Sequence, residues 1–152
     1  MKFSTRATYG LKALLYLADQ YGQRAVSASQ IAREEGISAS YLEQILHRLK
    51  KKQWIKSLRG PAGGYVLGSH PSEIKIGPVL RDLEGVKRKA GKERTSSAKK
   101  PNTPGVAALL FWAKLEKNFS QLIDSTSLKN LVDEARSHQK THSKTPGPSF
   151  NI

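Results

Sequence analysis

The sequence predicts a mainly helical protein with a small β wing: a winged helix-turn-helix domain joined to a long dimerisation helix. Two observations support this fold class. Residues 38–67 read as a capped amphipathic helix, a short strand, a glycine-rich turn and a returning strand. Farther along the chain, a long helix with two apolar stripes follows a basic segment that is nearly free of apolar residues. The first pattern predicts a recognition helix with its wing, and the second predicts an assembly element.

The first two helices are predicted from helical spacing of apolar residues and from their end signals. One should run from about Thr5 to Gln20, and the next from about Ala28 to Glu35. Ser27 and Gln30 fit a capping box at the start of the second helix, and Gly36 supplies its stop. The short turn after Gly36 leads directly into a third helix, which is the order of a helix-turn-helix.

The third helix should run from about Ala39 to Lys52, with an apolar stripe on one side and polar residues on the other. Two β-prone runs, 54–58 and 65–67, flank the turn Arg59-Gly60-Pro61-Ala62-Gly63-Gly64 and predict the wing. The expected buried stripe of the helix consists of Leu42, Ile45, Leu46 and Leu49.

The rest of the chain divides into four expected units: a winged helix-turn-helix domain over 1–85, a basic flexible loop over 86–103, a dimerisation helix with a short terminal helix over 104–137, and a disordered tail over 138–152. A short helix, about Pro78 to Glu84, ends the first unit. The long helix should run from about Pro104 to Asp124, and Ser127 should cap the terminal helix.

Two apolar stripes on the long helix predict two partners. One stripe contains Val106, Leu110 and Ala113, and the other contains Ala108, Trp112, Leu115, Phe119 and Leu122. One can pack on the chain's own domain, and a twin helix from a second subunit is the natural partner for the other. The alternative is a monomer that buries both stripes.

The charge of the chain predicts a polyanionic partner. Lys and Arg number 26 against 12 acidic residues, which gives a net charge of +14. A protein that binds nucleic acid without sequence preference would share this composition. A membrane partner is not expected, because no basic amphipathic anchor and no apolar run of roughly 20 residues is present. Without a signal-peptide core, the protein is expected to be cytoplasmic.

No cofactor, metal site or enzymatic activity is expected. The chain has no cysteine, which excludes disulfides and thiolate-held zinc or iron–sulfur groups on it. The four histidines are scattered, and only His138 and His142 share helical spacing. The glycine-rich turn lacks the lysine and the following Ser or Thr of a phosphate-binding P-loop. No serine lies in a Gly-x-Ser-x-Gly elbow.

The candidate DNA-binding residues lie on the third helix and the wing. Gln can read adenine, Glu can accept from the cytosine amino group, and an arginine at a wing tip can enter a narrow minor groove. Hydroxyls beside the exposed amides of a helix N-terminus suit a phosphate. The expected set is Ser38, Ser40, Tyr41, Glu43, Gln44, His47, Arg48, Arg59, Gly60 and Pro61. The alternative for the helical residues is a solvated polar face.

Several motifs resemble the Rrf2 family of bacterial winged-helix regulators. They are Lys2-Phe3-Ser4-Thr5, Tyr9-Gly10-Leu11, Ile37-Ser38-x-Ser40-Tyr41-Leu42-Glu43-Gln44, Leu58-Arg59-Gly60-Pro61-x-Gly63-Gly64-Tyr65-x-Leu67 and Ser127-Leu128-x-x-Leu131. The resemblance implies a homodimer that binds double-stranded DNA at a pseudo-palindromic operator and acts as a transcriptional regulator, more often a repressor.

Many family members hold an iron–sulfur cluster on three cysteines between the short helix and the dimer helix. Residues 86–103 occupy that place here and contain no cysteine, and Thr8 aligns where some members have an acidic ligand. The resemblance therefore extends to the cluster-free, cysteine-metabolism repressor type, which works through a partner enzyme. An effector small molecule or a regulatory partner protein would then carry the signal.

Overall fold

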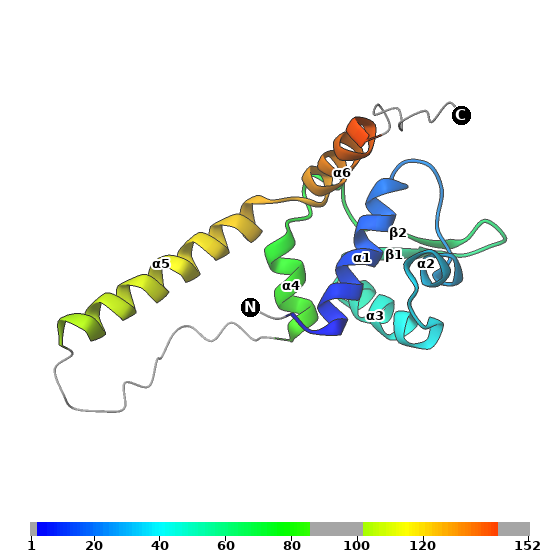
Figure 1. Ribbon diagram of the computed structural model, residues 1–152. Helices are drawn as coiled ribbons and strands as arrows, with labels where there is room; N and C mark the ends of the chain where they lie inside the picture. Colours follow the sequence, from blue (N-terminus) through cyan, green and yellow to red (C-terminus); the bar gives the residue numbers. More distant parts are fainter. Residues whose placement is uncertain (1–2, 86–101, 143–152) are drawn as a thin grey trace, which may run out of the picture.

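The computed structural model describes residues 3–85 and 102–142. Its elements in chain order are α1 (Thr5–Asp19), α2 (Ala28–Glu35), α3 (Ala39–Lys51), β1 (Ile55–Leu58), β2 (Gly64–Leu67), α4 (Ile76–Glu84), α5 (Thr103–Ser125) and α6 (Leu128–His142). The elements α1 to α4 form a winged-helix domain, α5 projects away from it, and α6 lies beside α1 (Figure 1). The predicted fold class is confirmed.

The helix α1 lies at the centre of the core, where it contacts α3, α4 and α6. The Ser4 hydroxyl starts the helix by accepting a hydrogen bond from the Ala7 N–H at 3.1 Å. Gly10 lets α4 approach closely, because a Cβ at this position would lie 2.6 Å from Leu83 Cδ1. Leu14 is fully buried, and a side chain of that size stabilises the fold by roughly 1.5–3 kcal/mol.

The helix-turn-helix forms as its end signals predict. The Ser27 hydroxyl accepts from the Gln30 N–H at 3.1 Å, and Gly36 ends α2 with φ 65° in the left-handed region. Ile37 is buried between the two helices, and its N–H donates to the Ala32 carbonyl. This short, fixed turn sets the direction of α3 relative to α2.

The wing is an antiparallel pair that is also fastened to the loop before α2. The pairing runs from Ile55 opposite Leu67 to Leu58 opposite Gly64. Tyr65 exchanges two backbone hydrogen bonds with Val26, at 2.8 and 3.0 Å. Gly64 is required there, since its φ is 149° and a Cβ would lie 2.5 Å from the Val26 carbonyl oxygen. The wing is thus fastened to the domain through β2, while residues 59–62 of its turn are exposed.

The helix α4 begins at Ile76, earlier than the expected Pro78. The proline falls in the first turn, where its missing N–H removes no intrahelical hydrogen bond. Ile76 is buried, and its N–H donates to the Thr126 carbonyl across the chain at 2.9 Å. This long-range contact extends the helix beyond the end that the proline indicates.

The helix α5 starts at Thr103, where the Asn102 side chain accepts from the Gly105 N–H at 3.0 Å. It contains no buried residue. The expectation that one apolar stripe packs on the chain's own domain is therefore wrong for most of its length. Contact is confined to its C-terminal part, where the rings of Phe119 and Phe3 stack at 6.1 Å and Asp124 pairs with Arg81 at 2.6 Å.

The helix α6 continues through His142, so the expected tail beginning at His138 is wrong for residues 138–142. Arg136 holds the helix to the end of α1 through a 2.6 Å ion pair with Asp19. Side-chain hydrogen bonds to the backbone also form within the last turns of the helix. For example, the Thr141 hydroxyl donates to the Ser137 carbonyl at 3.0 Å. Ser127 caps the helix as predicted, accepting from the Asn130 N–H at 3.2 Å.

The expected basic loop over 86–103 lies mostly outside the described residues, and its last residue, Thr103, is helical. The end of the tail, 143–152, also lies outside them. Within 3–85 and 102–142, no helix is long and apolar enough to cross a membrane.

Candidate nucleic-acid interface

The helix α3 has one face in the core and one in solvent. Its apolar stripe Leu42, Ile45, Leu46 and Leu49 is at most 1% exposed, as the sequence predicts. Ser40, Glu43, Gln44 and His47 are exposed on the other side. The two faces follow from the helical period, and burial of the first leaves the polar side chains of the second free to contact a ligand.

The N-terminus of α3 presents hydroxyls beside free backbone amides. Ser38 is exposed and caps the helix, with its Oγ accepting from the Tyr41 N–H at 3.4 Å. Tyr41 is half-buried, and its ring meets that of Tyr9 edge to face at 6.1 Å. The packing fixes Tyr41 against α1. Amides and hydroxyls at a helix N-terminus suit an anionic group.

The wing tip carries the other predicted residues. Arg59, Gly60 and Pro61 are all exposed. The tip turns tightly because Gly60 adopts φ 109° and its carbonyl accepts from the Gly63 N–H at 2.9 Å. The wing and α3 lie on the part of the domain that faces away from the free end of α5 (Figure 1).

The structure adds Arg6 to this surface, a residue that the sequence alone does not place there. A notch of about 320 Å³ on the outer side of α3 is lined by Arg6, Tyr41, Gln44, Ile45, His47, Arg48 and Lys51. Four of these residues, Tyr41, Gln44, His47 and Arg48, are predicted from the sequence to bind DNA. Arg6 comes from the first turn of α1, and no local pattern in the sequence connects it with α3. Only the packing of α1 against α3 brings it to the interface.

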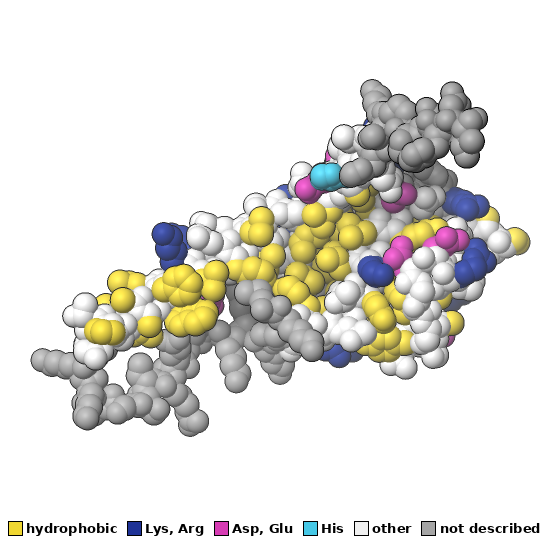
Figure 2. All heavy atoms as spheres, in the orientation of Figure 1, with side chains coloured by type: hydrophobic (Ala, Val, Ile, Leu, Met, Phe, Trp, Pro, Cys, Tyr) yellow, Lys and Arg dark blue, Asp and Glu magenta, His cyan; other side chains and the backbone are white. Residues whose placement is uncertain are grey.

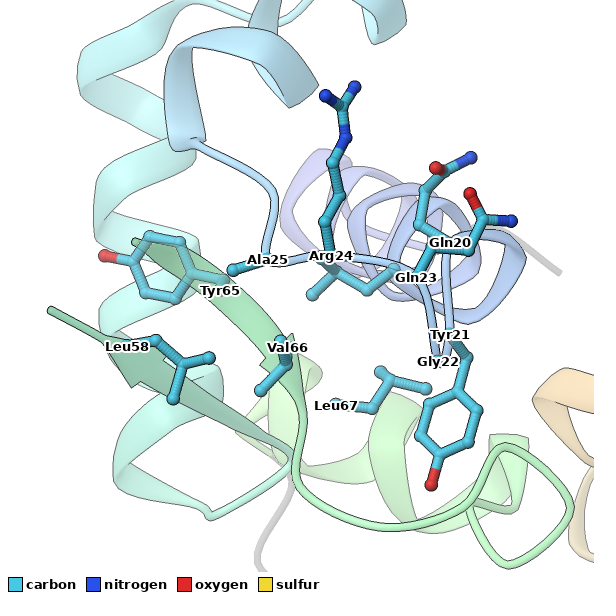
Figure 3. A pocket seen from close by; sticks show the side chains of 11 residues that line it. Gln20, Tyr21, Gly22, Gln23, Arg24, Ala25, Leu58, Tyr65, Val66 and Leu67 are labelled. Carbon is cyan, nitrogen blue, oxygen red and sulfur yellow. The ribbon is translucent and has the colours of Figure 1, made fainter. Parts of the chain in front are cut away.

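Two further hollows lie away from the α3 surface. One, of about 400 Å³, separates the α1–α2 loop from the wing strands. Figure 3 shows Leu58, Val66 and Leu67 on the strand side of that loop, while Gln20, Gln23 and Arg24 extend from its other side. The other, also about 400 Å³, lies between α1, the end of α2 and α6, and includes Leu15, Leu131 and Val132.

The long helix exposes an unusual amount of apolar surface. Leu110 is 66% exposed, Trp112 62% and Leu122 64%. Figure 2 shows apolar side chains gathered along α5 and continuing onto the adjoining face of the winged-helix domain. Contiguous apolar patches of this kind mark interaction surfaces, because solvated monomers seldom leave them uncovered.

No group of three or more His, Cys, Asp or Glu residues within the described part of the chain could hold a metal ion. Thr8, which takes the place of an acidic cluster ligand in some members of the resembled family, is exposed, and its hydroxyl donates to the Ser4 carbonyl at 3.2 Å.

Comparisons with known proteins agree with the fold and with a role in transcriptional regulation. Residues 3–134 match the model of the Rrf2 family, described as an iron-dependent transcriptional regulator. The chain is 33% identical over 143 residues to the HTH-type transcriptional regulator CymR of Bacillus subtilis, and this match covers 93% of this chain and 97% of CymR. It is 31% identical over 135 residues to IscR of Sodalis glossinidius, covering 87% of this chain and 79% of that protein.

Solved structures give the same result. The structure of CymR, the global cysteine regulator of B. subtilis, is similar with a TM-score of 0.73 at 33% identity, and the match covers 88% of this chain and 98% of that one. T. potens IscR gives a TM-score of 0.74 at 31% identity, covering 99% and 97%. These relatives are transcriptional regulators, as the sequence motifs indicate.

The iron named in the family description does not fit this chain. The chain contains no cysteine to supply thiolate ligands, and its described residues contain no substitute cluster of His and carboxylate ligands. The DNA-binding fold, by contrast, is present from α1 through the wing. The chain belongs to the Rrf2 family and is a DNA-binding transcriptional regulator.

Proposed function

We propose that the protein is a cytoplasmic homodimeric repressor that binds a pseudo-palindromic operator without an iron–sulfur cluster. The observation that carries this proposal is the exposed polar face of α3 beside an anchored, projecting wing. Each winged-helix domain would place one α3 in the major groove of one half-site. Binding there would block access of the polymerase to the promoter.

The roles of the α3 residues follow from their positions. Gln44 and Glu43 are exposed one turn into the helix and are suited to read base edges. Ser38, Ser40 and Tyr41 lie at the helix N-terminus and would contact a phosphate. His47 and Arg48, farther along, would approach the DNA backbone at the edge of the groove.

The wing would contact the neighbouring minor groove. Arg59 is exposed at the tip, and a guanidinium is attracted to the strong negative potential of a narrow A-tract groove. Gly60 lets the backbone approach closely, and Pro61 stiffens the turn.

The homodimer is proposed from the exposure of α5. A monomer that buries both stripes is not compatible with a helix on which no residue is buried. A second α5 offers the same apolar stripes in return, so a two-fold arrangement would cover both helices at once. This arrangement also supplies the two half-site readers that a pseudo-palindrome requires.

The signal would come from an effector small molecule or from a regulatory partner protein. The groove between α1 and α6 supports a small molecule, since it joins an apolar floor to two ion pairs, Lys12–Glu35 and Arg136–Asp19. The exposed apolar surface of the chain leaves room for a partner protein as well.

The experiment that tests the function is recovery of bound DNA. Fragments that co-purify with the protein from its host are sequenced, and affinity for the recovered motif is compared with that for unrelated DNA at physiological salt. A specific regulator should prefer its motif by about a thousandfold or more. Equal competition by unrelated DNA would instead favour a nonspecific nucleic-acid-binding or architectural protein.

A further inference from the structure

We propose that a backbone phosphate of the bound DNA is held in the notch between α3 and the first turn of α1, and that Arg6 is a phosphate-positioning residue. The cationic notch is defined by Arg6, Tyr41, Gln44, Ile45, His47, Arg48 and Lys51 and holds about 320 Å³. The inference rests on the proposed α3 interface and adds to it a fixed phosphate contact from a different helix.

The geometry brings two guanidinium groups to one point. Both lie near the position that a Cβ on Gly85 would take. Arg48 Nη2 is 3.7 Å from that position, and Arg6 Nη2 is 3.9 Å from it. They come from α3 and α1, which contact each other in the core. Two guanidinium groups at such a point can donate to the two non-bridging oxygens of one phosphodiester.

The notch is positively charged and has no acidic residue in its lining. None of the ion pairs within 3–85 and 102–142 involves Arg6, Arg48 or Lys51. The neighbouring carboxylate of Glu84 is directed to the Ser4 N–H, which donates to it at 2.8 Å. Like charges that face a shared space repel one another, and an anion in that space relieves the repulsion.

Arg6 is held in place before any ligand binds. Its Nε donates to the Leu83 carbonyl and its Nη2 donates to the Glu84 carbonyl at 3.2 Å, so it closes the C-terminus of α4. A guanidinium has five N–H donors, and the remainder stay free for a phosphate. Because the side chain is ordered in advance, binding costs less conformational entropy than it would for a mobile lysine.

The notch would set the position of the base reader. Gln44 belongs both to the exposed face of α3 and to the lining of the notch. A phosphate fixed between Arg6 and Arg48 therefore defines how far α3 enters the groove. Phosphate contacts fix register and orientation without reading sequence, so loss of Arg6 should weaken all DNA binding alike.

The test compares Arg6→Gln and Lys51→Gln with Lys129→Gln, each of which removes one positive charge. Lys129 is exposed on α6, on the other side of the domain from α3 (Figure 1), where it pairs with Asp133. Affinity of the full-length protein for a short random-sequence duplex is measured over a range of salt concentrations. The salt exponent is the slope of the logarithm of affinity against the logarithm of salt concentration. For each notch variant, the size of this exponent should fall by about one per protomer bound, whereas Lys129→Gln should keep the wild-type value.

Folding is monitored by thermal melting, since Arg6→Gln also removes two hydrogen bonds to α4. Lys51 is exposed, so Lys51→Gln removes a charge from the notch without removing a structural contact of the kind that Arg6 makes. This second variant keeps the test decisive if Arg6→Gln does not fold. The proposal is overturned if Lys51→Gln and a folded Arg6→Gln keep the wild-type salt exponent. Because the probe is random duplex, this result does not depend on whether a specific operator exists.

A second measurement uses the operator once it has been recovered. Each phosphate is replaced in turn by a neutral methylphosphonate. At one position in each half-site, this replacement should lower the affinity of the wild type. The affinities of Arg6→Gln and Lys51→Gln, which are already lower, should not fall further when the same phosphate is replaced. Independent losses at every position would contradict a shared phosphate in the notch.

Discussion

Gln44 shows how one side chain acquires a role from its position. It is exposed on α3 one turn beyond the N-terminus, while Ile45 and Leu46 beside it are buried at 1% and 0% exposure. The buried neighbours fix the rotation of the helix, and Gln44 is therefore presented outward without depending on its own contacts. This separation of the buried supporting residues from the proposed base reader makes substitution of Gln44 informative about binding alone.

Gln44→Ala is expected to cost about 1–3 kcal/mol on the recovered operator and little on random DNA, because it removes a bidentate contact to a base edge. The measurement is a titration of labelled duplexes with both DNAs at one salt concentration. Equal losses on both would show that Gln44 does not read a base. Lys129→Ala, remote from α3, is the control.

Arg59→Ala is expected to weaken operator binding by about 1.5–3 kcal/mol, the range of hydrogen bonds to charged groups. The effect should be largest when the flanking sequence is an A-tract, whose minor groove is narrow. Arg59 is exposed at the wing tip, so melting temperature and dimer mass should remain those of the wild type. A sharp fall in melting temperature with unchanged affinity would mean that Arg59 is structural.

Much of the interface could be predicted at this scale, for a physical reason. The exposure of Ser40, Glu43 and Gln44 follows from the period of a single helix, which the sequence contains in full. Arg6 could not be predicted, because its place beside α3 depends on how α1 packs against other helices. Helical periodicity assigns faces, whereas contacts between distant helices require the assembled core.

At the scale of elements, the predicted helices and wing agree with the structure except where long-range contacts move an end. Pro78 suggested the start of α4, yet the buried Ile76 and its hydrogen bond to Thr126 begin the helix earlier. The ion pair of Arg136 with Asp19 holds α6 to α1 just before residues 138–142, where the helix continues past its expected end. End signals in the sequence are local, and they give way to tertiary contacts of this kind.

The exposed stripes of α5 lead to a prediction about assembly. Trp112→Glu should convert the dimer to a monomer, because it places a charge within an apolar interface, while the fold of the monomer should survive since Trp112 is 62% exposed. Light scattering at micromolar concentration measures the mass, which should be twice that of the chain for the wild type. Circular dichroism confirms folding.

Gln121→Glu is the matched control, since it adds the same charge on the same helix at an exposed polar position. It should remain dimeric. A wild-type protein that is monomeric and still binds the operator with full affinity would contradict the proposed dimer.

For the whole molecule, the described elements place a polar surface and an apolar surface at opposite ends. The polar surface of α3 and the wing tip lie away from the apolar free end of α5 (Figure 1). The α5–α6 junction is fastened to the segment that follows the wing, where the Leu128 N–H donates to the Ile74 carbonyl at 3.0 Å. A change in the long helix therefore has a direct backbone connection to the DNA-binding domain. Net charge predicted the type of partner, whereas the sequence of the operator depends on contacts that one chain does not contain.

The last prediction concerns sensing by the whole molecule. The Rrf2 family model is described as iron-dependent, but this chain has no cysteine, and its described residues contain no cluster of metal-binding side chains. Protein purified without oxygen should therefore be colourless and contain no stoichiometric iron. Its affinity for DNA should be the same after exposure to mild oxidants or nitric oxide, because the chain offers no thiolate for either reagent. Iron analysis and visible absorption provide the measurement, and a cysteine-containing family member purified in parallel shows that the procedure preserves clusters. A cluster absorption band with matching iron content would mean that ligands other than thiolates hold a cluster here, and the cluster-free mechanism would have to be abandoned.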